Sequence, residues 1–153
     1  EITVSTDGAQ QSVSVLATVL GIRERDALGT VIETRLRVDS NTAERIALDT
    51  ASLNLFGANL KPFPLVQADP SGKLTVDAGG AVTVDALFEF PAELAVSDTD
   101  LAGLSLRWVL EAGDRRFVRT TSFEREKRDD YDTDRIHHYY PYYYYHGIHP
   151  VYW

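Results

Sequence analysis

The side chains with the clearest potential for chemistry are the four histidines, and all of them lie in residues 136–153. Two are adjacent and two are three residues apart, so four imidazoles could converge on Zn²⁺ or Cu²⁺. The spacing matches no closed structural zinc motif. We therefore hold Zn or Cu binding as one hypothesis, and stacking of the imidazoles among neighbouring tyrosines as its alternative. The candidate metal ligands are His137, His138, His146 and His149.

The same segment holds seven of the eight tyrosines in the chain and one of its two tryptophans. Such side chains bury large apolar areas while a polar tip stays hydrated, and they are enriched where proteins bind one another. A run of tyrosines also favours extended backbone, so it could add a strand to the sheet edge of another subunit. The candidate partner-binding residues are Tyr139, Tyr140, Tyr142, Tyr143, Tyr144, Tyr145, Tyr152 and Trp153.

We expect this segment to be a docking arm. Packing of the arm against its own domain is the main alternative, and a low-complexity tail without a role is another.

Catalytic motifs find little support in the sequence. The chain has no cysteine, which excludes thiolate catalysis and disulfides, and it contains no P-loop, GxGxxG after a strand, or HExxH. A serine nucleophile would need its histidine base from the tail. Paired carboxylates cannot be identified from sequence, because their separation in space decides their chemistry. We expect a protein that is not an enzyme and has no cofactor.

A calcium-loop pattern begins at Asp130 and continues through Asp132 and Asp134. Arg135 stands where an EF-hand requires glycine, and Pro141 stands where it requires a bidentate glutamate. The pattern is more typical of a solvated acidic linker.

The overall charge limits the classes of partner. Fifteen Lys and Arg residues against 23 Asp and Glu residues give a net charge of −8, whereas a nucleic-acid binder needs a basic face. No apolar run approaches the roughly 18 to 20 residues that a membrane-spanning helix needs. We expect protein subunits as partners, in a homo-oligomer or a larger complex, with no nucleic acid and no membrane span.

The elements that must position the tail are short strands. In residues 30–38, Ile32, Thr34, Leu36 and Val38 alternate with charged residues, which predicts a strand with one buried and one solvated face. Residues 81–90 alternate in the same way. Residues 104–110 and 116–123 flank a short glycine-containing connection typical of a hairpin, with Trp108 as a core anchor.

Helical signals are weak, with one possible turn in residues 92–104. The pattern predicts an all-β sandwich of about seven to eight strands in residues 1–124. A charged linker over 125–135 and the docking arm over 136–153 follow.

The order of these segments resembles a known family. A strand ends in a polar turn at Asn41, Leu53 to Phe56 follow, and a proline-containing gap leads to a Gly79-Gly80 turn and a strand that closes on Phe88-Glu89-Phe90-Pro91. This is similar to the telokin-like, immunoglobulin-like accessory domains of bacterial exported proteins and lipoproteins. The resemblance covers residues 11–123. It implies an immunoglobulin-like β-sandwich, a non-catalytic role, and a periplasmic, cell-surface or extracellular location.

The leading hypothesis is therefore a structural subunit of an exported complex or filament that docks its aromatic tail on a neighbouring subunit. The alternative is an accessory module that binds a metal through the histidines or a glycan through the tyrosines.

Overall fold

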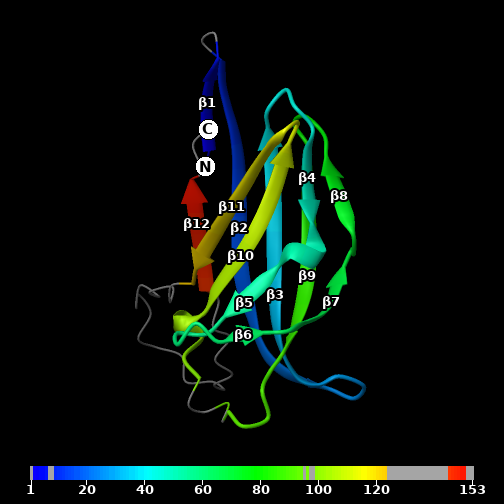
Figure 1. Ribbon diagram of the computed structural model, residues 1–153, viewed down its shortest axis with the longest axis vertical. Coiled ribbons are helices and arrows are strands. Elements are labelled where there is room, and N and C mark those ends of the chain that lie inside the picture. Colours follow the sequence, from blue (N-terminus) through cyan, green and yellow to red (C-terminus); the bar gives the residue numbers. More distant parts are fainter. Residues whose placement is uncertain (1, 7–8, 95, 97–98, 124–144, 151–153) are drawn as a thin grey trace, which may run out of the picture.

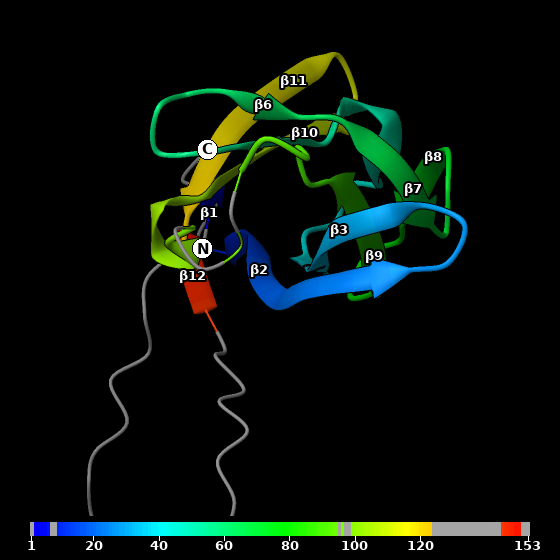
Figure 2. The same cartoon turned by 90° about the horizontal axis from the view of Figure 1, so that it is seen from below.

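The computed structural model describes residues 2–6, 9–94, 96, 99–123 and 145–150, and within them the strands form two six-stranded antiparallel sheets. The first sheet consists of β1 (Ile2–Thr6), β2 (Ala9–Arg25), β3 (Gly29–Asn41), β7 (Leu65–Asp69), β9 (Ala81–Glu89) and β12 (Tyr145–Pro150). The second consists of β4 (Ile46–Asp49), β5 (Asn54–Phe56), β6 (Pro62–Phe63), β8 (Lys73–Val76), β10 (Ser105–Ala112) and β11 (Arg115–Ser122). Figures 1 and 2 show the two sheets face to face as the layers of a sandwich.

The predicted all-β sandwich is confirmed, with more strands than the seven or eight expected. The additional strands are β1, β6, β7 and β12, which have two to six residues each and are too short to show a clear period of two in the sequence. Short strands also share one edge of a long strand. β4 and β5 both pair with β10, at residues 110–112 and 105–107 respectively, and β1 and β12 both pair with β2.

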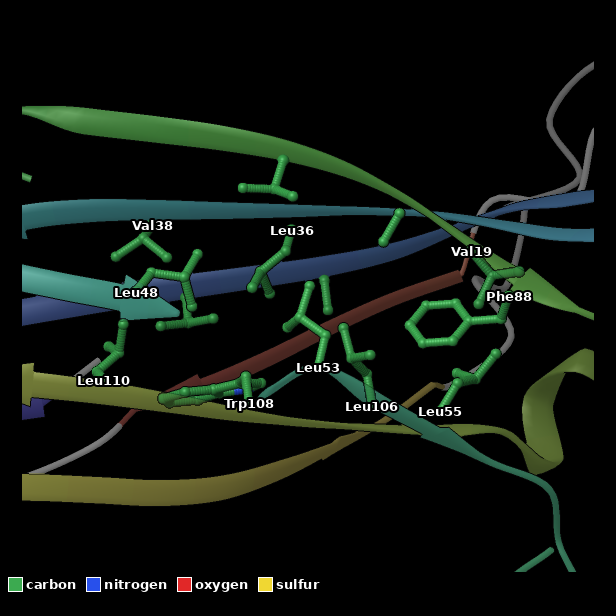
Figure 3. Close-up of a cluster of buried hydrophobic side chains, with 14 of the residues drawn as sticks. Val19, Leu36, Val38, Leu48, Leu53, Leu55, Phe88, Leu106, Trp108 and Leu110 are labelled. Carbon is green, nitrogen blue, oxygen red and sulfur yellow. The ribbon is translucent and has the colours of Figure 1, made fainter. Parts of the chain in front are cut away.

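The core lies between the sheets. The predicted alternation in β3 is confirmed, because Ile32, Thr34, Leu36 and Val38 are all buried. Figure 3 shows Leu36 and Val38 of the first sheet facing Leu48, Leu106 and Leu110 of the second, with the ring of Trp108 between the layers. Trp108 is fully buried, as expected for a core anchor.

The connections follow the turn chemistry of the sequence. The proline-containing segment forms β6 at the edge of the second sheet, where a missing backbone donor costs no ladder bond. β7 ends at Asp69 and β8 begins at Lys73, so the sequence Asp-Pro-Ser-Gly, which is typical of a turn, connects the two strands. Two short 3₁₀ turns, Thr50–Ser52 and Leu101–Gly103, begin after Asp49 and Asp100, whose carboxylates accept backbone N–H bonds. No α-helix occurs in the described ranges.

A single residue out of register reverses the facing of β2. Pairing with β3 shifts between Val19 and Gly21, so Leu20 is bulged. Before the bulge Val15, Ala17 and Val19 face the core, and after it Ile22 packs against the core instead. Gly21 has φ of +140°, a conformation that side-chain-bearing residues rarely adopt. The bulge therefore places Arg23 and Arg25 on the outer face rather than in the core.

Candidate docking edge

The aromatic tail enters the described structure as β12, which is a strand of the first sheet. β12 pairs antiparallel with β2 in a continuous register from Tyr145 opposite Val19 to Pro150 opposite Ser14. The red arrow of Figure 1 shows it along the side of the sandwich, close to β11 of the second sheet. For these six residues the strand is added to the chain's own sheet, as in the alternative in which the arm packs against its own domain. Docking of the tail on a neighbouring subunit stays a prediction.

The edge of β2 that receives β12 has defined limits. β1 occupies the same edge over Ala9 to Val13, and β12 takes over at Ser14. At the other side, the first described pair is Tyr145 opposite Val19, and the bulge of β2 between Val19 and Gly21 follows directly. Residues 14–19 are therefore a strand-length acceptor between β1 and the bulge, and we call them the docking edge.

Both sides of the docking edge are well covered. On the core side Val15, Ala17 and Val19 have no exposed area. On the outer side Leu16 is half-buried and Thr18 is 7% exposed. A strand with both faces covered depends on its edges for further pairing, because its backbone N–H and C=O groups need partners once water is excluded. Removal of β12 would leave the N–H and C=O groups on this edge without their strand partner, beside a largely apolar core.

The two ends of the described chain meet along this edge. Ile2 lies opposite Val13 of β2, and Pro150 lies opposite the next residue, Ser14. Both β1 and β12 run antiparallel to β2, so β12 leads directly into the line of β1. Pro150 lacks an N–H donor and sits at the junction, where the ladder passes from one strand to the other.

The outer face of β3, which is the neighbour of β2 in the sheet, carries two ion pairs. Arg35 donates two hydrogen bonds to Asp85 of β9, at 2.7 and 2.9 Å, and Arg37 pairs with Asp39 at 2.7 Å. The hydrogen bond from Arg35 lowers the pKa of Asp85, its partial burial opposes that shift, and the positive charge reinforces it. Asp39 responds to Arg37 in the same way, so its pKa is also lowered.

Glu33 departs from the expected solvated face. Its position on β3 is on the outer side, but the residue is only 6% exposed because Arg23 and Arg25 both pair with its carboxylate. The two arginines reach it from β2 only because the bulge has turned them outward. A buried carboxylate with two cationic partners is a structural ion pair, and it fixes the β2–β3 hairpin beyond the bulge.

The described residues hold part of the candidate sites. Tyr145, His146 and His149 lie on β12, in register with Val19, Thr18 and Val15. The other candidates fall outside the described residues, namely Tyr139, Tyr140, Tyr142, Tyr143, Tyr144, Tyr152, Trp153, His137 and His138. The Asp130 to Asp134 pattern falls outside them as well. Within the part of the chain that is described, no group of three or more histidines or carboxylates is placed to hold a metal ion.

Sequence reasoning did not identify residues 14–19 as the acceptor. The available signal was the change at Leu16, where strict alternation gives way to the run Leu-Ala-Thr-Val-Leu. Such a run indicates a strand covered on both faces, but it does not say which segment covers its edge. Which strand pairs with it depends on contacts far apart in the chain.

Comparison with known proteins adds no further constraint, because no family model, curated protein or solved structure matches this chain. Among the described residues no helix is long and apolar enough to cross a membrane.

Proposed function

We propose that this protein is a non-catalytic structural subunit of an exported multi-subunit complex or filament, and that its aromatic C-terminal tail docks on a neighbouring subunit. The observation that carries the proposal is that a segment of the tail, β12, adds to a sheet edge as a strand, here the edge of its own chain. It gives the tail a means of attachment, since a strand added to a sheet edge gains affinity from main-chain hydrogen bonds.

The composition of the tail supports the same role. Seven tyrosines and a tryptophan within residues 136–153 offer far more apolar area than a six-residue strand needs to pair. Aromatic clusters of this size are costly to leave in water and are typical of binding surfaces. The resemblance to accessory domains of exported bacterial proteins supports the assignment to an exported complex.

The outer face of the first sheet around β3 is less suited to docking than the edge of β2. The outer face of β3 carries Arg35 and Arg37 in pairs with Asp85 and Asp39. Burying such a face against a partner would desolvate four charges that already satisfy one another. An edge-pairing contact avoids that cost.

Deletion of residues 136–153 tests the proposal. We expect the truncated protein to remain folded and to lose assembly, measured as molar mass by light scattering across a concentration series. Hydrogen exchange supplies the internal control. Amides of residues 14–19 should exchange faster after deletion, while those of residues 31–38, between β2 and β9, should keep their protection.

A second variant tests the contribution of the tyrosines independently of the strand. It replaces five tyrosines that precede β12 with serine and leaves the sequence of β12 unchanged: Tyr139, Tyr140, Tyr142, Tyr143 and Tyr144. We expect weaker assembly, with no faster amide exchange in residues 14–19. If the deletion variant assembles like the full chain, the proposed function is wrong.

A further inference from the structure

The pairing between β12 and the docking edge can be made by either of two copies of the chain. The last described residue before the tail is Phe123, and β12 begins at Tyr145. The intervening residues 124–144 span roughly 70 Å when fully extended. The ladder itself is main-chain hydrogen bonding, which is the same whether the strand comes from its own chain or from an identical one.

We propose that β12 is exchanged between molecules, so that Tyr145–Pro150 of one copy pairs with Ser14–Val19 of a second copy in the register that it has within one chain. This inference rests on the proposed function and names the neighbouring subunit as a second copy. Exchange of an identical element is a low-cost route to assembly, because every contact of the closed monomer is remade.

The donor strand is one that every copy of the chain carries. Within one chain Tyr145–Pro150 pairs with residues 14–19 of β2, directly after the residues that pair with β1 and before the bulge between Val19 and Gly21. The same strand from a second copy can make the same main-chain ladder in the same register, which favours a second copy over an unrelated protein.

The other long edge at this side of the sandwich is less suited to receive a strand. β11 pairs with β10 alone among the described strands, and its outer edge carries Arg116 and Arg119, both exposed. Charged residues along an edge discourage further pairing. The exchange is therefore directed to β2.

Each copy carries one donor and one acceptor, so the geometry allows two products. Reciprocal exchange closes a two-fold dimer, whereas one-way donation leaves an acceptor at one end and a donor at the other and grows a filament. Either product contains the same β12–β2 contact.

The absence of cysteine in the chain allows a direct test. Leu16 and Ile148 are opposite one another in the register, so L16C and I148C proteins are prepared separately, with tags of different mass. They are then mixed and oxidised. We expect a disulfide-linked heterodimer that runs on a non-reducing gel at the sum of the two tagged chain masses, between the two homodimers, and that disappears on reduction.

The matched control replaces L16C with T83C. Thr83 is exposed on β9 of the same sheet and pairs with Arg37 of β3, so it is separated from the edge of β2. Mixing T83C with I148C should give no heterodimer above the level of random collision. Ser14 and Pro150 form a second opposed pair at the other end of the described ladder. Mixing S14C with P150C should therefore also give a heterodimer, which would show that the result does not depend on a local effect of the first pair of substitutions.

Two results together would contradict exchange. The doubly substituted L16C/I148C chain would form its disulfide only within one chain, and mixtures of L16C with I148C would give no more heterodimer than mixtures of T83C with I148C. If deletion of residues 136–153 still abolished assembly, the tail would dock elsewhere on its neighbour, and the proposed function would stand without the exchange. If the deletion left assembly unchanged and no heterodimer formed, both the proposed function and the exchange of β12 would be wrong.

Discussion

The indole nitrogen Nε1 of Trp108 donates a hydrogen bond of 2.9 Å to the hydroxyl oxygen of Thr121, across the β10–β11 hairpin. Both residues are completely buried. A buried tryptophan needs a partner for its one polar atom, and here a single threonine supplies it. The pair ties β11, an edge strand, to the centre of the core.

Replacing Thr121 with valine should destabilise the protein by about 1–3 kcal/mol, because the shape is kept and the indole N–H is left without a partner. Serine keeps the hydroxyl and should cost about 1 kcal/mol or less, for one lost methyl group. Urea unfolding of the two variants measures the difference. Equal losses would show that the hydroxyl contributes nothing beyond packing.

Replacing Glu33 with glutamine should lower the free energy of unfolding by about 2 kcal/mol, since the charge that holds Arg23 and Arg25 is removed from a nearly buried position. The matched control is Asp39→Asn. It breaks a pair whose side chains are both more than two-fifths exposed and should cost about 1 kcal/mol or less. A larger loss for Asp39→Asn would contradict the assignment of Glu33 as the structural ion pair.

The depressed pKa of Asp85 predicts a contribution to acid sensitivity. A carboxyl whose pKa is lower in the folded protein than its ordinary 3.8 stabilises the fold above that value and loses the contribution as the pH falls through the folded pKa. The free energy of unfolding of the wild type should therefore fall more steeply below about pH 4 than that of Asp85→Asn. High salt should reduce the difference, because the pair is half exposed. Parallel curves for the two proteins would show that this carboxyl has the same pKa folded and unfolded.

Removing divalent metal should leave the assembly unchanged if the tail acts by strand pairing and aromatic burial. The measurement is molar mass and melting temperature before and after dialysis against EDTA, with metal analysis of the starting protein. A fall in molar mass that Zn²⁺ or Cu²⁺ restores would instead favour the metal-binding alternative, with His137, His138, His146 and His149 as the ligands.

Residues 30–38 and 81–90 show how far local pattern determines the fold. Alternation placed Ile32, Thr34, Leu36 and Val38 in the core and identified Trp108 as an anchor, because a strand with one buried face must repeat every two residues. The composition of residues 136–153 likewise set the aromatic tail apart from the domain. These features depend on neighbours in sequence, and so the sequence alone determined them.

The edge that β12 occupies was decided only by the tertiary structure. Main-chain pairing carries little sequence information, so nothing in Tyr145–Pro150 specifies residues 14–19 as its partner. The limits of that edge come from β1 at one end and from the bulge at the other. The same bulge turns Arg23 and Arg25 toward Glu33, which alternation alone placed in solvent. The facing of these arginines depends on a one-residue shift in register, and such a shift is set by how the strands pack together rather than by any local preference.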